Sequence, residues 1–173
     1  MADGGRLPGQ AGTSDIAIRA AVDADGPALM ALVGRCYAGF WACVLWVDGE
    51  TPYLRRPASV AAERDWRFWV AEREGRVVGS VAIKPEPGER PAQRVASFYV
   101  HPGARRLRIG SRLMDIAEAD ATGRGAAIMV LWSDTRFIEA HALYEARGYR
   151  RTGETRALDD MSLTREFAFE KTL

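Results

Sequence analysis

The sequence is poor in cysteine and has no long apolar run. Its two cysteines, Cys36 and Cys43, have no histidine or further cysteine at a spacing that would complete a metal site. One pair of cysteines in an apolar stretch makes no disulfide framework, so we expect both to be reduced core thiols. A run of about 18 apolar residues, the minimum for a membrane-spanning helix, is also missing, so we expect no membrane contact.

An excess of charge of either sign is likewise missing. Lys and Arg number 24 against 23 Asp and Glu, for a formal net charge of +1. This balance argues against a nucleic-acid-binding protein and leaves room only for a local basic site. The Gly-rich fingerprints of Rossmann and P-loop proteins are absent, as is the Gly-x-Ser-x-Gly elbow of serine hydrolases. A covalent serine intermediate is therefore not expected.

The first 14 residues lack the apolar stretch of a signal peptide. We expect residues 1–14 to form a disordered tail and the protein to be cytoplasmic. Residues 15–173, with the chain at 47% apolar content, suit a single domain that buries one core.

Hydrophobic periodicity predicts a mixed α/β fold. We expect residues 66–71 and 76–83 to pair as a hairpin, and the apolar run 127–132 to be a central strand buried on both faces. The other expected strands are 15–20, 94–100, 149–156 and 166–170, and the expected helices are 29–40, 59–64, 105–123 and 133–147.

Two segments carry residues that core building does not require. In the first, the expected strand 94–100 passes into a helix through a turn that contains Arg105, Arg106 and Arg108. Free N–H groups of a first helical turn, together with forked guanidinium donors, including Arg112, can bind phosphate. A solvated basic helix start is the alternative interpretation. In the second segment Tyr144 lies on a helical face, where it either packs in the core or serves the site.

Together the two segments resemble the GNAT family of N-acetyltransferases. The turn with Arg105 to Ser111 is similar to the family's acyl-CoA-binding motif, and Ala140 to Tyr149 (Ala-x-x-x-Tyr-x-x-x-Gly-Tyr) is similar to the segment that follows it. The resemblance extends from about residue 16 to residue 173. It implies a central mixed sheet of about seven strands with helices on both faces, and acetyl-CoA as the acyl donor without a metal.

The resemblance also implies roles for particular residues. The pantetheine arm would lie along the strand that ends at Val100, whose N–H would polarise the thioester carbonyl. Tyr144 would be the general acid that protonates the leaving thiolate. Phe137 stands where the family commonly has an asparagine that contacts the pantetheine arm. The full set of expected donor-binding residues is Phe98, Tyr99, Val100, Arg105, Arg106, Leu107, Arg108, Ile109, Gly110, Ser111 and Phe137.

The sequence departs from the family pattern at three further positions. The glutamate that often serves as general base is absent, so Asp134 is our first substitute, with a helix cap as its alternative role. Weaker candidates for the base are Asp48, Glu50, His141 and a chain of water molecules. Arg106 and Arg108 replace common glycines. In a left-handed conformation each would cost about 1–2 kcal/mol, whereas helical angles would add two guanidinium groups to the phosphate site.

An aromatic segment follows the first expected helix. Phe40, Trp41, Trp46 and Glu50 are our expected acceptor-binding residues, and Tyr53 could shape the same pocket, with closure of the core as the alternative role for the aromatic ones. We expect acetyl transfer to a primary amine of a small molecule by direct attack. The alternatives are acetylation of a protein lysine or N-terminus, and a non-catalytic acyl-CoA-binding module. Because related enzymes are often dimers, the resemblance also suggests a homodimer.

Overall fold

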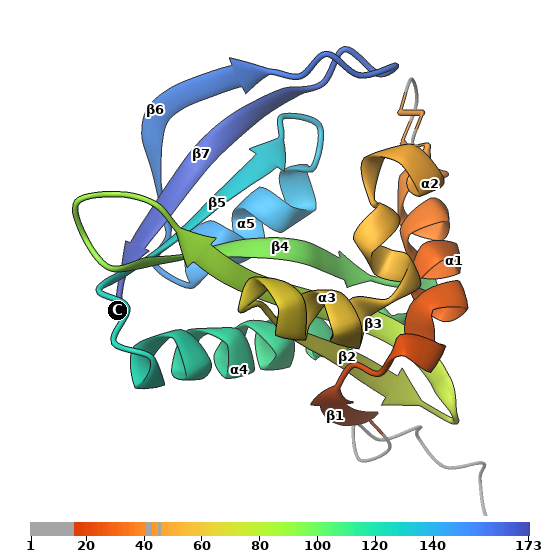
Figure 1. Ribbon diagram of the computed structural model, residues 1–173. Coiled ribbons are helices and arrows are strands. Elements are labelled where there is room, and N and C mark those ends of the chain that lie inside the picture. The colour runs from red at the N-terminus through yellow and green to blue at the C-terminus, as the bar shows by residue number, and fades with distance from the viewer. Residues whose placement is uncertain (1–15, 41–42, 45) are drawn as a thin grey trace, which may run out of the picture.

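The computed structural model describes residues 16–40, 43–44 and 46–173, whose strands form one mixed sheet (Figure 1). The seven strands lie in the order β1-β2-β3-β4-β5-β7-β6. Only β4 and β5 pair in parallel, and the other pairs are antiparallel, including the expected hairpin of β2 and β3. The strands are β1 (Ile16–Ala20), β2 (Arg67–Arg73), β3 (Arg76–Glu86), β4 (Ala92–Val100), β5 (Ile128–Asp134), β6 (Arg150–Ala157) and β7 (Arg165–Thr172). The expected tail, residues 1–14, lies outside the described residues.

Helices cover both faces of the sheet, as expected. Because side chains of a strand alternate between faces, Ala82 packs with α1 on one face while its neighbours Val81 and Ile83 pack with α4 on the other. Helix α3 lies beside α1, and α5 lies on the same face as α4 (Figure 1). The helices are α1 (Gly26–Tyr37), α2 (Val47–Glu50), α3 (Pro57–Arg64), α4 (Ile109–Gly123) and α5 (Ile138–Ala146), with short 3₁₀ turns at Asp23–Asp25, Pro52–Arg55 and Pro102–Ala104.

Two helix starts differ from the sequence prediction. Helix α4 begins at Ile109 and not at Arg105, because Arg106 and Arg108 both have positive φ and break the helical path. Helix α5 begins at Ile138 and not near residue 133, because β5 continues through Asp134. The side chain of Asp134 caps no helix, and Phe137 occupies the N-cap position.

The prediction that residues 127–132 are buried on both faces was wrong. In β5 burial alternates, with Met129 and Leu131 buried and the residues between them half-buried. Met129 and Leu131 face α4 and α5, whereas helices α1 and α3 lie over the β1–β4 half of the sheet and leave this part of the other face open (Figure 1). The open face is where an acceptor site can form.

The sheet opens between its two parallel strands. β4 and β5 pair through only three residue pairs, Ala92 with Ile128 to Arg94 with Val130, and they diverge beyond that point (Figure 1). A bulge in β4 follows, where Ser97 has a φ of 48° and its carbonyl accepts a hydrogen bond from the Ser80 hydroxyl at 2.8 Å. The backbone of β4 beyond the bulge is thereby free of β5.

Candidate functional site

The opening between the strands leads into a first cavity of about 640 Å³. Its walls come from α1, the end of β4, the arginine turn (residues 105–108), the start of α4, and α5. The cavity brings together most of the expected donor-binding residues, and its lining consists of Cys36, Tyr37, Phe40, Phe98, Tyr99, Val100, Ala104, Arg105, Arg106, Arg108, Ile109, Gly110, Ser111, Phe137, Glu139, Ala140, Ala142, Leu143 and Tyr144. Leu107 is not among them, because its side chain packs against the core beneath α4.

The arginine turn adopts the strained, left-handed conformation at Arg106 and Arg108 and not the helical one. Arg106 has a φ of 64° and Arg108 a φ of 59°, so both residues are left-handed. Arg105 has a negative φ and pairs with Glu139 of α5 at 2.8 Å across the cavity. Arg112 faces elsewhere and donates to the carbonyl oxygen of Ile16 at 2.9 Å. Three guanidinium groups therefore line this cavity.

The start of α4 presents backbone donors to the same cavity. The N–H groups of Ile109, Gly110 and Ser111 belong to a first helical turn and have no acceptor within the helix. A Cβ on Gly110 would lie 3.3 Å from both Phe98 and Leu143, so glycine keeps this end of the helix close to β4. Together with the arginines, these donors make a site that suits a pyrophosphate group.

A second cavity of about 330 Å³ lies on the open face of the sheet. Five residues line both cavities and mark where the two meet: Tyr37, Phe98, Tyr99, Phe137 and Tyr144. The rest of its lining is Val44, Glu50, Tyr53, Lys84, Arg94, Val95, Ala96, Ser97, Leu131, Trp132, Ser133, Asp134, Arg156, Leu158, Asp160, Ser162, Thr164 and Glu166.

Tyr144 is held at the junction of the cavities by aromatic packing. Its ring centroid lies 5.9 Å from that of Phe98, 6.0 Å from that of Tyr149 and 5.6 Å from that of Phe169. Burial raises the pKa of Tyr144 above its ordinary value. The phenol is therefore protonated at neutral pH and can donate to an atom at the junction.

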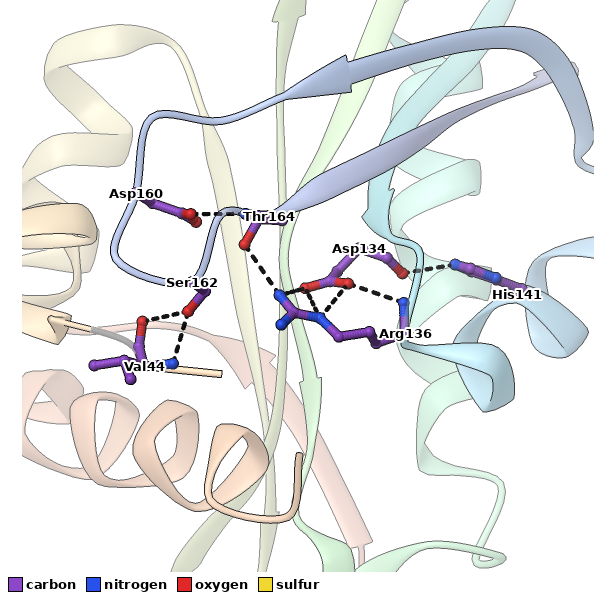
Figure 2. A network of polar contacts seen from close by, with 7 residues as sticks. All are labelled: Val44, Asp134, Arg136, His141, Asp160, Ser162 and Thr164. Atoms are coloured by element: carbon purple, nitrogen blue, oxygen red, sulfur yellow. Dashed lines mark hydrogen bonds and ion pairs between the residues drawn. The ribbon is translucent and has the colours of Figure 1, made fainter. Parts of the chain in front are cut away.

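Asp134 is buried and forms an ion pair with Arg136. Both carboxylate oxygens accept from the guanidinium group, with Nε at 2.9 Å and 3.1 Å and Nη2 at 2.6 Å, and the Arg136 amide donates to Oδ1 at 2.9 Å (Figure 2). The pair shapes the turn between β5 and α5. Hydrogen bonding with Asp134 raises the pKa of Arg136.

The same network holds the loop between β6 and β7 over the second cavity. Arg136 donates to the Thr164 hydroxyl at 3.2 Å, and the Thr164 amide donates to Asp160 at 2.8 Å (Figure 2). At the tip, the Ser162 hydroxyl accepts from the Val44 amide at 2.7 Å and donates to the Val44 carbonyl at 2.8 Å. Segments 118 residues apart thus meet at the rim of the cavity.

The expected acceptor-binding residues are dispersed. Phe40 packs against Phe137 with a centroid separation of 4.5 Å and tilted rings, and it lines the first cavity, not the second. Trp46 is 64% exposed and lines neither cavity. Glu50 lines the second cavity and accepts from the Trp46 amide at 3.2 Å. Trp41 lies outside the described residues.

His141, a weaker candidate for the general base, is buried away from both cavities. Its Nε2 lies 3.0 Å from the carbonyl oxygen of Asp134 (Figure 2). Its ring packs against Phe167 and Phe169. Burial lowers the pKa of this imidazole. The contacts describe a neutral histidine that fastens α5 to β5 and β7.

Several site residues were not singled out by sequence reasoning. Tyr99 was expected, but its neighbour Tyr37 was read only as part of the helix face. Tyr53, by contrast, belongs to the aromatic segment expected to shape the acceptor pocket; it lines the second cavity and hydrogen-bonds the Ser97 hydroxyl at 2.8 Å beside the β4 bulge. Lys84 was missed because the expected strand 76–83 ends before it, whereas β3 continues to Glu86. Arg94 and Arg156 were missed because each looks like an ordinary solvated strand residue. Side-chain alternation along a strand places Lys84 and Arg94 on the same sheet face as core residues two positions away, and this was the one available signal.

Within the described ranges, no helix is long and apolar enough to cross a membrane. In the same part of the chain, no cluster of three or more His, Cys, Asp or Glu side chains is arranged to hold a metal ion. The two cysteines are unbonded to each other, with Cys36 buried and Cys43 partly buried.

Comparisons with known proteins point to one family. The model of the acetyltransferase (GNAT) family matches residues 30–149. An IAA acetyltransferase of Azospirillum brasilense is 35% identical over 94 residues, which are 53% of this chain and 60% of that protein. The chain matches less than two thirds of the length of each of the curated relatives found, with shares of 60%, 44% and 27%.

Solved structures share the fold. A GNAT-family acetyltransferase of Staphylococcus aureus Mu50 superposes with a TM-score of 0.77 at 18% identity, covering 91% of this chain and 99% of that one. YncA from Salmonella typhimurium, solved with its cofactor acetyl-CoA, gives a TM-score of 0.72 at 18% identity, covering 92% of this chain and 94% of that one. At these identities the likeness concerns the fold alone.

Proposed function

The chain belongs to the GNAT acetyltransferase family, and from that premise we propose that it transfers an acetyl group from acetyl-CoA to a primary amine, chiefly of a small molecule. One observation carries the proposal. The first cavity is lined by N–H and guanidinium groups that suit a phosphate and by the phenol of Tyr144, which also lines the second cavity. A donor and an acceptor can therefore meet at Tyr144 from two sides.

The residues of the first cavity fit the chemistry of the donor. The N–H groups at the start of α4 and the guanidinium groups of Arg106 and Arg108 would hold the pyrophosphate. Neither of these two guanidinium groups has a carboxylate partner in the described part of the chain. Arg105 already pairs with Glu139, so a phosphate would have to share the Arg105 guanidinium group with that carboxylate. The apolar wall formed by Phe98, Leu143 and Phe137 would accompany the pantetheine arm.

Acetyl-CoA supplies a thioester that an amine can attack directly. Attack places negative charge on the carbonyl oxygen, which we expect a backbone N–H near Val100 to stabilise. As the C–S bond breaks, the sulfur takes up the electron pair and Tyr144 donates a hydrogen bond or proton to it. The raised pKa of Tyr144 keeps that proton available at neutral pH.

The acceptor amine must lose a proton, because an alkylamine with a pKa of about 10.4 is mostly charged at neutral pH. Asp134 remains our predicted base, but it would first have to be released from its ion pair with Arg136. Both of its oxygens accept from Arg136, so Asp134 would take up a proton only as that ion pair opens. An Arg136→Gln protein, in which the ion pair is lost and the carboxylate is retained, separates the two roles. Loss of turnover in Asp134→Asn with retention in Arg136→Gln supports the base.

Calorimetric titration tests the donor site. We expect acetyl-CoA to bind and 3′-dephospho-CoA to bind more weakly, because the arginine turn supplies more guanidinium groups than a pyrophosphate alone needs. Release of free thiol in the presence of a panel of amines then tests turnover. If acetyl-CoA fails to bind, the proposal is wrong; if it binds and no amine or peptide is acetylated, a non-catalytic acyl-CoA-binding module is the better account.

Acetylation of a protein lysine or N-terminus is the second enzymatic candidate. The loop between β6 and β7 contacts Val44 and narrows the second cavity, which favours a small acceptor over an extended peptide.

We further propose a cytoplasmic location, since both thiols are free and suit a reducing compartment. We propose a homodimer only because the chain resembles enzymes that are often dimers, and sedimentation measurements of its molecular mass test this.

A further inference from the structure

Three cationic residues line the second cavity, two of them where the pairing of β4 with β5 ends and the third reaching in from β6. Lys84 of β3 and Arg94 of β4 are cross-strand partners and both line the cavity. Arg156 of β6 lines it as well, and its guanidinium group lies 4.4 Å from the ring centroid of Trp132. We call Lys84, Arg94 and Arg156 the cationic floor.

Two of these three cations already have carboxylate partners. Arg94 pairs with Glu86, and Arg156 pairs with Glu166 at 2.5 Å. Lys84 has no ion pair within the described residues, and its ammonium group lies 5.0 Å from the ring centroid of Trp66. The sequence has one other lysine, Lys171, which pairs with Glu118 at 2.6 Å. Lys84 is thus the one member of the floor without an ion pair of its own in the described residues, and Glu86 attracts it only at longer range.

The other acidic side chains of the cavity are engaged elsewhere. Asp134 pairs with Arg136, Asp160 accepts from the Thr164 amide, and Glu50 accepts from the Trp46 amide. Burial and the neighbouring Arg94 lower the pKa of Lys84, which shows that its surroundings disfavour the charge. An anion bound beside Lys84 would offset the repulsion from Arg94 and add to the attraction that Glu86 already supplies.

The floor is separated from the junction of the cavities by a definite stretch of β4. Arg94 precedes Ser97 by three residues, which is roughly 10 Å along a strand. Tyr144 and Phe98, where the acetyl group would be transferred, lie beyond Ser97. A molecule that reached both places would have its anionic group at one end and its amine at the other.

We propose that the cationic floor, through Lys84, binds the anionic group of an acceptor whose amine lies several bonds away at Tyr144. The acceptor would carry a carboxylate or a phosphate at the end remote from its amine, as an ω-amino acid does. The position of the amine rests on the proposed acetyl transfer, whereas the anion site itself does not.

Binding of matched, unreactive probes tests the anion site independently of turnover. The probes are 6-acetamidohexanoate, its phosphonate counterpart and the neutral N-hexylacetamide, each titrated into the protein with CoA present. We expect both anions to bind more tightly than the neutral amide, by about tenfold for one charge-assisted contact. The ratio between the two anions decides between a carboxylate and a phosphate.

Three variants assign the effect to the charge of Lys84. Lys84→Met should abolish the preference for anions, and Lys84→Arg should keep it, because guanidinium retains the charge and cannot act as a base near pH 7. Lys171→Met removes the same charge from outside the cavity and should leave the preference intact. Thermal unfolding confirms that each variant is folded.

Equal affinity for anionic and neutral probes, or an undiminished preference in Lys84→Met, would overturn the inference. A preference lost equally in Lys84→Arg would also overturn it, because the guanidinium group retains the positive charge. Turnover of 6-aminohexanoate against hexylamine is measured alongside. If the anions bind through Lys84 and neither amine is acetylated, the anion site stands and the proposed transferase function fails.

Discussion

At the scale of single residues, Tyr144 is the side chain on which the proposed chemistry depends most. It lines both cavities, and burial keeps its phenol protonated. We expect Tyr144→Phe to lower the turnover number by about 10²-fold or more, with acetyl-CoA binding unchanged, because the ring stays and only the donor is lost. Steady-state kinetics and calorimetry on the same protein measure the two quantities.

A matched control is available beside it. Tyr149 packs against Tyr144 with a centroid separation of 6.0 Å but lines neither cavity. Tyr149→Phe should therefore keep turnover within about twofold of the parent protein. A loss of the same size in both variants would mean that the effect comes from packing and that Tyr144 is no acid.

Arg108 carries a second prediction at this scale. Its φ of 59° is costly for a residue with a side chain, so Arg108→Gly should raise the free energy of unfolding by about 1 kcal/mol. Arg105→Gly is the control, because Arg105 has a negative φ and gains nothing from glycine. Chemical denaturation measures both. A loss of stability in Arg108→Gly would contradict the left-handed strain.

At the scale of elements, β1 is fastened to the start of α1 by one ion pair. Asp25 is buried and accepts from both terminal nitrogens of Arg19 at 2.8 Å, and from the Val22 amide at 2.8 Å. Hydrogen bonding with Arg19 lowers the pKa of Asp25 in the folded protein. A carboxyl whose pKa is depressed on folding stabilises the fold above its unfolded pKa of about 3.9 and loses that effect as the pH falls through the folded value.

Asp25→Asn should therefore destabilise the protein at pH 7 by about 2 kcal/mol, because Arg19 loses its bidentate partner. The difference from the parent should shrink as the pH falls below about 4, where the parent's own carboxyl becomes protonated. Asp65→Asn is the control, since Asp65 is 61% exposed and its pairs contribute little. A pH-independent difference for Asp25→Asn would contradict the ionic origin.

At the scale of the whole molecule, the sheet consists of two parts joined by a narrow contact. β1–β4 and β5–β7 share three residue pairs, and the first cavity is lined by residues from both sides of the junction. Acetyl-CoA would bridge them. At about 100 times its dissociation constant it should stabilise the fold by about 2.7 kcal/mol, seen as a rise in melting temperature.

Two glycines of α4 test whether the stabilisation comes from the cavity. A Cβ on Gly110 would press on Phe98 and Leu143, whereas one on Gly123 meets nothing within 4 Å. Gly110→Ala should weaken the effect of acetyl-CoA on the melting temperature, and Gly123→Ala should leave it unchanged. Equal shifts in the two variants would place the donor elsewhere.

The sequence by itself determined the mixed sheet, the strand hairpin and the family, because period-two and helical patterns and the two motifs are local in the chain. It also placed most residues of the first cavity, since the turn from Arg105 to Ser111 is one continuous segment. The family prediction was confirmed by the match to residues 30–149. The roles assigned to single residues stay predictions.

Only the tertiary structure decided the rest. Local pattern cannot show that the face beside β5 is left open or that Asp134 is held by Arg136. The left-handed path of Arg106 and Arg108 was open on sequence, because either conformation is compatible with arginine at some cost. Lys84, Arg94 and Arg156 come from three different strands. Their common cavity exists only once the sheet has brought those strands together.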